Sequence, residues 1–265
     1  MMTSNPSAIR DAYDNVYASL AGPFGGDERY RWIAARYFAP LTAPQSILEI
    51  GCGEGTLLAY LASRGHWVAG IDVSASGVAK ATAKGIACHQ LDISTQPLPF
   101  PDRAFGWVVC LETIEHLENP HRCLQEIGRV LVDGGALLIS IPNSRIGHPY
   151  CYPGLFERAP FMRFLELHGF HVMSVEGWGQ GQTMNNLQRR LEGLAWMRRL
   201  GMTAALKYFV RKRNLLMRKT RTPLRYAHCW NFLCRYRADH PDPLTHIATI
   251  MHAGDPSSPD RSMNR

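Results

Sequence analysis

The chain has 265 residues, 46% of them apolar and 19% charged, which is typical of a soluble globular protein with one large domain. No uncharged apolar run is long enough to span a bilayer, and residues 1–10 lack the apolar core of a secretory signal. The seven scattered cysteines form no C-x-x-C pair, which indicates reduced thiols, and we expect a cytoplasmic protein rather than a secreted or membrane-spanning one.

Two helices are expected within residues 1–45. Apolar residues keep helical spacing up to Leu20, and Gly22 can end the first helix. The second helix is expected over residues 27–38, before Pro40. These helices either cover a binding site or pack on the sheet that follows, and the sequence leaves both alternatives open.

From residue 46 onward, short apolar strands alternate with helices, which is the pattern of a parallel sheet covered on both faces. Asn119 and Pro120 are typical of the N-cap and first position of a helix, here through Leu131, and a turn is expected at 133–135. Strands are expected at residues 46–50, 66–71, 86–91, 107–111, 136–141, 170–176 and 245–251. The predicted fold class is therefore α/β, with a Rossmann-like, seven-stranded, mostly parallel sheet.

The positive charge is concentrated late in the chain. The formal net charge is +7, yet residues 189–237 alone hold 14 lysines and arginines against one acid, Glu192. We therefore divide the chain into N-terminal helices (1–45), a ligand-binding core (46–180), a basic helical insertion (181–244), the last strand of the core sheet (245–253) and a disordered tail (254–265).

Residues 47–55 read Ile-Leu-Glu-Ile-Gly-Cys-Gly-Glu-Gly and are followed by a helical pattern that Gly65 ends. This is a strand, a glycine turn and a helix start, where free N–H groups and a partial positive charge are available. A dinucleotide fingerprint has the spacing G-x-G-x-x-G, whereas the third glycine comes one residue earlier here. Glu49, just before the first glycine, disfavours a pyrophosphate and favours a cationic ligand.

Acidic residues follow several expected strands. In an open α/β sheet, ligands bind beyond the carboxyl ends of the strands, where Glu49, Asp72, Asp92 and Glu112 lie. Asp72 is placed to accept hydrogen bonds from ribose hydroxyls, and Asp92 to accept one from an adenine amino group. The alternative for each aspartate is a helix cap or a turn former.

Together, these motifs resemble class I S-adenosylmethionine-dependent methyltransferases, over about residues 46–176. The likeness is to the bacterial branch that methylates small molecules, quinones, lipids and glycans. The resemblance implies S-adenosyl-L-methionine as cofactor. The cofactor contacts that we expect are Glu49, Gly51, Cys52, Gly53, Gly55, Asp72, Val73, Asp92, Ile93 and Leu111.

Residues 112–116 read Glu-Thr-Ile-Glu-His. This E-x-x-E-H pattern resembles one in ubiquinone-pathway O-methyltransferases and small-RNA 2′-O-methyltransferases, where it supports a divalent metal. Such a metal is the less favoured alternative here, and we predict no metal ligands. Without a metal, His116 is the first candidate for the general base, and His148 is the second.

The basic segment has three interpretations. It lies on an anionic membrane through residues 185–237, holds an anionic acceptor, or packs on the sheet as a solvated insertion. Nucleic acid is disfavoured as a partner because the aromatic residues do not form a stacking platform.

The function we predict is methyl transfer to an oxygen atom of a small-molecule, glycan or lipid-linked acceptor. One alternative is a metal-assisted O-methyltransferase of a quinol or an RNA end. The other is a non-catalytic adenosyl-binding protein associated with a membrane.

Overall fold

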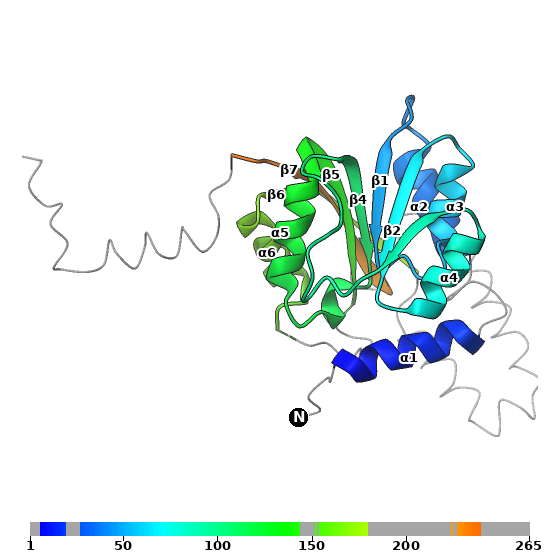
Figure 1. Cartoon of the computed structure of the whole chain (residues 1–265). Helices are drawn as coiled ribbons and strands as arrows, with labels where there is room; N and C mark the ends of the chain where they lie inside the picture. The colour runs from blue at the N-terminus through cyan, green and yellow to red at the C-terminus, as the bar shows by residue number, and fades with distance from the viewer. Residues whose placement is uncertain are drawn as a thin grey trace, which may run out of the picture.

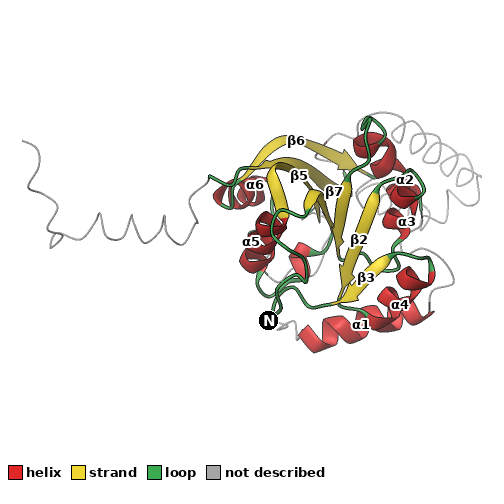
Figure 2. Cartoon of the chain, turned by 45° about the horizontal axis from the view of Figure 1, so that its top comes forward, coloured by secondary structure: helices red, strands yellow, loops and turns green. Residues whose placement is uncertain are grey.

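The computed structural model describes residues 6–19, 27–143, 152, 154–179, 224 and 227–239. A seven-stranded sheet with the order β3-β2-β1-β4-β5-β7-β6 forms its centre. Helices cover both faces of the sheet, and α1 runs across one end of it (Figure 1). Figure 2, turned by 45°, shows α5 and α6 together on one side and α2 and α3 on the other.

The elements follow one another much as the sequence predicts. The helical elements are α1 (Pro6–Ser19), α2 (Glu28–Ile33), η1 (Ala34–Phe38), α3 (Thr56–Ala62), α4 (Ala75–Ala83), η2 (Ile114–His116), α5 (Pro120–Val130) and α6 (Arg158–Leu167). The strands are β1 (Ser46–Ile50), β2 (Trp67–Asp72), β3 (Ala87–Gln90), β4 (Phe105–Leu111), β5 (Leu131–Pro142), β6 (Phe170–Trp178) and β7 (Cys229–Tyr236). The predicted N-cap of α5 is confirmed, because the Asn119 side chain accepts a hydrogen bond from the N–H of Arg122 at 3.0 Å.

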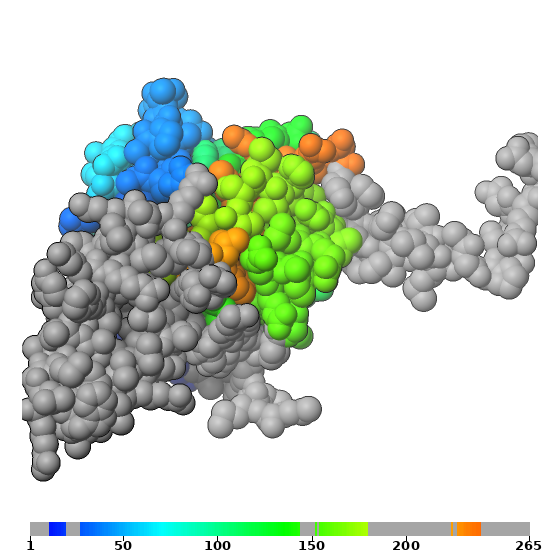
Figure 3. All heavy atoms as spheres, turned by 180° about the vertical axis from the view of Figure 1, so that it is seen from behind, coloured from blue at the N-terminus to red at the C-terminus, as the bar shows by residue number. Residues whose placement is uncertain are grey.

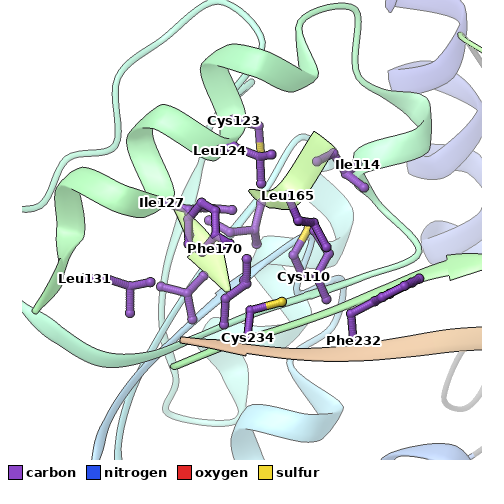
Figure 4. Packing of buried hydrophobic residues seen from close by; sticks show 14 of the residues in the cluster. Cys110, Ile114, Cys123, Leu124, Ile127, Leu131, Leu165, Phe170, Phe232 and Cys234 are labelled. Carbon is purple, nitrogen blue, oxygen red and sulfur yellow. The ribbon is translucent and has the colours of Figure 1, made fainter. Parts of the chain in front are cut away.

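The central strands β1, β4 and β5 are buried on both faces, because alternate residues enter two different cores. Val108 and Cys110 of β4 pack with α5 and α6, whereas Trp107 and Val109 pack with α2, η1 and α3. Figure 4 shows the first core, in which residues of α5 point toward strand residues such as Cys110 and Phe232. Burying each such large apolar side chain stabilises the fold by roughly 1.5–3 kcal/mol.

The prediction that residues 229–236 belong to a helical insertion is wrong. The seventh strand is β7, Cys229–Tyr236, which the sequence analysis assigned to the basic insertion. It lies between β5 and β6 and is antiparallel to both, so Trp230, Phe232 and Cys234 face the core of α5 and α6. Burial of these alternating apolar residues stabilises the strand. The arginines close to it in the sequence are the reason why it was assigned to the basic insertion. The edge formed by β6 and α6 is seen beside β7 in Figure 3. Residues 245–251 lie outside the described residues.

The expected turn at 133–135 is also wrong, because these residues belong to β5. Phe105 pairs with Leu131 but Trp107 pairs with Ala136, so the intervening residues bulge out of the ladder. Gly134 supports this bulge with a φ of 71°.

Among the described residues, no helix is long and apolar enough to cross a membrane.

Arg129 on α5 ties the connector before β4 to the helix layer. Its guanidinium donates to the carbonyl oxygens of Leu98 (3.0 Å) and Phe100 (2.8 Å) and to the carboxylate of Asp102 (2.8 Å). It also donates to both oxygens of Glu126 and holds the pKa of that carboxyl below its ordinary value. One side chain thus satisfies two backbone acceptors and pairs with two acids.

We predict that Arg129→Ala lowers the free energy of unfolding by about 2–3 kcal/mol, because several charge-assisted hydrogen bonds are lost together. Urea denaturation at neutral pH measures the change. Since the pKa of Glu126 is lowered in the folded state, the difference from the parent should shrink as pH falls below the unfolded-state value of about 4.3.

Arg163→Ala is the matched control, because Arg163 is exposed on the neighbouring helix α6. Equal midpoints for the two variants would contradict the role assigned to Arg129.

Candidate functional site

The glycine turn forms as the sequence predicts. The backbone angle φ is 72° at Gly51, 52° at Gly53 and 69° at Gly55, a region that glycine adopts at little cost. Gly55 is the N-cap of α3. The N–H groups of Gly51 and Cys52 both donate to the carbonyl oxygen of Ile71, which fastens the turn to β2.

Close packing is a second reason for glycine at two of these positions. A side chain at Gly51 or Gly53 would collide with protein atoms. A Cβ on Gly51 would lie 2.2 Å from Thr113 Oγ1, and one on Gly53 would lie 2.3 Å from the Tyr17 hydroxyl. Close packing of the protein on the turn therefore accounts for two of the glycines.

Glu49 is the most unusual polar group of the site. It lies one residue before the end of β1 and is only 3% exposed, and burial raises the pKa of its carboxyl well above the usual range. Its Oε2 atom is buried and has no hydrogen-bond partner among the described residues. A buried oxygen in this state costs about 1–3 kcal/mol, so it is a natural acceptor for a donor group of a ligand.

Asp72, at the end of β2, connects the glycine turn to the next helix. Its carboxylate accepts hydrogen bonds from the N–H groups of Gly53 at 2.7 Å and Ser74 at 2.8 Å. Burial raises its pKa despite these two bonds. Ser74 in turn caps α4 by accepting from the N–H of Gly77.

The remaining predicted cofactor residues lie at the same edge of the sheet but differ in what they contact. Asp92 accepts a hydrogen bond from the N–H of Ser94, so the local turn uses part of its carboxylate. Ile93 and Leu111 are buried in the two cores, and the Val73 carbonyl accepts from Gln90. The buried thiol of Cys52 lies against Cys88.

Helix α1 covers this edge. Tyr17 packs on Gly53, and Asp14 accepts hydrogen bonds from the Ser74 hydroxyl at 2.5 Å and the Ser76 N–H at 3.0 Å. Figure 1 shows α1 lying across the end of the sheet near α4. Helix α2 and η1 instead pack on the sheet through Ile33 and Phe38. Helix α1 therefore covers the candidate site, whereas α2 and η1 pack on the sheet. The sequence had left both alternatives open for these helices.

His116 lies on η2, where Tyr13 of α1 reaches it. The Tyr13 hydroxyl is 3.2 Å from His116 Nε2, and Glu115 Oε1 is 3.8 Å from the same nitrogen. Burial, followed by the charge of Glu115, raises the pKa of Tyr13 to about 12, so its hydroxyl keeps its proton. Glu115 is fully buried, and its pKa is raised well above the usual range by burial and then by Glu112. His148 lies outside the described residues.

Arg29 is a residue of the site that sequence reasoning missed. From α2, it forms an ion pair with Glu112 at 2.9 Å and donates to Ser140 Oγ at 2.8 Å. It also stacks over the Trp178 ring, 5.6 Å from its centroid. Glu112 has a φ of 48°, which is uncommon for a residue with a side chain, and the ion pair helps to hold it there. Tyr13 and Tyr17, four residues apart on α1, were missed as site residues as well.

In the part of the chain that the structure describes, no three histidine, cysteine or acidic side chains are grouped to hold a metal ion. Glu112 is turned toward Arg29, while Glu115 is enclosed in the protein interior.

The chain is similar to known methyltransferases. The model of a family described as a methyltransferase domain matches residues 48–139. A probable S-adenosylmethionine-dependent methyltransferase of Mycolicibacterium smegmatis is 30% identical over 195 residues, covering 71% of this chain and 76% of that protein. A ubiquinone biosynthesis O-methyltransferase of Glaesserella parasuis is 32% identical over 109 residues, or 37% of this chain and 46% of that protein.

Other relatives match over a shorter share of their length. The chain spans 42% of two probable S-adenosylmethionine-dependent methyltransferases of Mycobacterium tuberculosis, at 30% identity. Among solved structures, a SAM-dependent methyltransferase from Archaeoglobus fulgidus has a TM-score of 0.56 and 17% identity, covering 80% of this chain and 96% of that one, which shows a shared fold. With the M. smegmatis relative, these matches show that the chain belongs to the family of S-adenosylmethionine-dependent methyltransferases.

Proposed function

We propose that this chain transfers a methyl group from S-adenosylmethionine to an oxygen atom of a small-molecule, glycan or lipid-linked acceptor. The observation that carries the proposal is the buried Oε2 of Glu49, which has no hydrogen-bond partner among the described residues and stands beside the glycine turn. The amino group of the cofactor is a cationic donor that would satisfy this oxygen and offset the cost of its burial.

The other residues at the edge fit the same cofactor. Asp72 already accepts two backbone hydrogen bonds, but a carboxylate has about four acceptor positions, so ribose hydroxyls can still donate to it. We expect the backbone of Gly51 to Gly55 to follow the cofactor, with Asp92 nearest to its adenine. Because the Tyr17 side chain packs on Gly53, we expect this side chain to move away when the nucleoside binds.

We assign the general base to His116. When bound, the cofactor supplies a methyl group already activated on a cationic sulfur. The protein therefore has to align the acceptor oxygen at about 3 Å and remove its proton. Nε2 of His116 lies 3.2 Å from the Tyr13 hydroxyl, at the edge that α1 covers. An acceptor hydroxyl would take the place of Tyr13 at this nitrogen when it binds.

A quinol is a specific candidate for the acceptor, because the G. parasuis relative is named for ubiquinone biosynthesis and for O-methylation. Contact with an anionic membrane through residues 185–237 stays a prediction, since most of that segment lies outside the described residues.

Transfer of labelled methyl groups into separated quinol, lipid, glycan and RNA fractions identifies the acceptor class. Label in none of these fractions, despite cofactor binding, would contradict the proposal and support a non-catalytic adenosyl-binding protein.

The role of Glu49 is tested with Glu49→Gln. We expect calorimetry to show at least about tenfold weaker S-adenosylmethionine binding, because a charge-assisted hydrogen bond is lost. We also expect this variant to be more stable than the parent at neutral pH. The folded-state pKa of Glu49 is raised, so its contribution to stability is complete below the unfolded value of about 4.3 and is lost as pH rises.

The stability gain of Glu49→Gln should therefore vanish in acid below about pH 4.3, where both states of the parent are protonated. Glu166→Gln is the control, since Glu166 is exposed on α6 and is not among the residues assigned to the site. If Glu49→Gln binds S-adenosylmethionine as tightly as the parent, Glu49 does not bind the cofactor as proposed.

The role of His116 as general base is tested with His116→Ala. If His116 removes the acceptor proton, kcat should fall by about 10²–10⁴-fold while the Kd of S-adenosylmethionine stays near the parent value. Single-turnover kinetics with saturating cofactor measures this.

Tyr13→Phe is the matched variant, because it removes only the hydroxyl that contacts His116. We expect a smaller loss of kcat, about tenfold, as for a group that positions the base. A His116→Ala enzyme that turns over at the parent rate would show that another group takes the proton.

A further inference from the structure

Two cysteine side chains meet beside the glycine turn. Cys52 Sγ lies 3.8 Å from Cys88 Sγ, although the residues are 36 positions apart in the sequence. Cys52 is the residue between Gly51 and Gly53, and Cys88 belongs to β3. The strand β2 lies between β3 and β1, the strand that the glycine turn follows.

A glycine in the intervening strand makes this contact possible. Gly70 of β2 pairs with Glu49 on one side and with Cys88 on the other. A Cβ on Gly70 would lie 2.7 Å from Cys52 Sγ, which real side chains essentially never tolerate. The absence of that side chain lets the two thiols approach each other across the strand.

The accessibility of the two thiols differs from that of the other described cysteines. Cys88 is half-buried, so a small solute reaches it, while Cys52 is 7% exposed. Cys110, Cys123, Cys229 and Cys234 are each 0% exposed. The contact with Cys52 lowers the pKa of the Cys88 thiol, which favours the nucleophilic thiolate.

We propose that Cys52 and Cys88 are a reversible oxidation site, at which a peroxide closes a disulfide that displaces the glycine turn and weakens nucleoside binding. The oxidation site does not depend on the proposed function. The effect of oxidation on nucleoside binding does rest on the proposed function.

The reaction balances with hydrogen peroxide as oxidant. The Cys88 thiolate attacks one peroxide oxygen, which breaks the O–O bond, leaves Cys88 as a sulfenic acid and releases hydroxide, which becomes water on taking up a proton. The Cys52 sulfur then attacks the Cys88 sulfur, the S–O bond breaks, and the Cys52 proton leaves with the hydroxyl as a second water. The two sulfurs together lose two electrons, and the peroxide gains them. A dithiol reductant reverses the change by exchange.

Closure must move the turn. A disulfide has an S–S length of about 2.05 Å, so the sulfurs have to approach by roughly 1.8 Å from their present separation. Cys52 is held between two glycines, and the next residue, Gly53, donates its N–H to Asp72. Drawing Cys52 toward β3 therefore shifts the backbone that we expect to follow the cofactor. Displacements of about 1 Å in such sites are costly.

The test treats the full chain with hydrogen peroxide and maps its cysteines by mass spectrometry without reduction. We expect a peptide that joins Cys52 to Cys88, while the enclosed neighbours Cys110 and Cys123 remain thiols and serve as the internal control. The oxidised protein should bind S-adenosylmethionine at least about tenfold more weakly, with full recovery after reduction.

Cys88→Ser is the informative variant, because Cys88 is not among the residues assigned to the cofactor. It should bind the cofactor as the reduced parent does and should be insensitive to peroxide, with circular dichroism confirming its fold. Absence of the joined peptide, or a joined peptide with unaltered cofactor affinity, would overturn the proposal. If even the reduced parent fails to bind the cofactor, the proposed function fails, while the peptide map still decides whether the oxidation site exists.

Discussion

The carboxyl edge of the sheet is organised around buried acids. Glu49, Asp72 and Glu115 are each less than 10% exposed, and burial raises the pKa of all three. A buried carboxylate is costly unless it is paired or hydrogen-bonded. Asp72 gains two backbone hydrogen bonds, and the nearby Arg29 opposes the rise in pKa of the other two. Glu49 keeps one oxygen without a partner among the described residues, so the fold bears a local cost at the position where a cationic ligand would relieve it.

The N-terminal helices complete this edge. The sheet places the strand ends side by side, but it is α1 that brings Tyr13 to His116 and Tyr17 to the glycine turn. Helix α2 adds Arg29, which holds Glu112 in its uncommon backbone conformation. Residues before the core therefore supply contacts on both the expected cofactor side and the expected acceptor side.

Features with a local cause were predictable from the sequence. The glycine turn, the Ser74 cap and the Asn119–Pro120 helix start depend on residues within a few positions of one another. Arg29, Tyr13 and Tyr17 were missed because their roles arise only when distant segments meet. The strand Cys229–Tyr236 was missed because arginines lie beside it in the sequence, and its burial depends on both β5 and β6. The close packing on the glycine turn also depends on tertiary contacts, since Thr113 and Tyr17 occupy the space that a side chain would need there.

A crystal structure with S-adenosylhomocysteine, the demethylated product of the cofactor, tests the central claim most directly. We expect the nucleoside between the glycine turn and α1, with its amino nitrogen within about 3 Å of Glu49 Oε2. Tyr17 should have moved away from Gly53, and Asp72 should accept from the ribose. A nucleoside bound elsewhere, or one that leaves the Glu49 oxygen without a partner, would contradict the account.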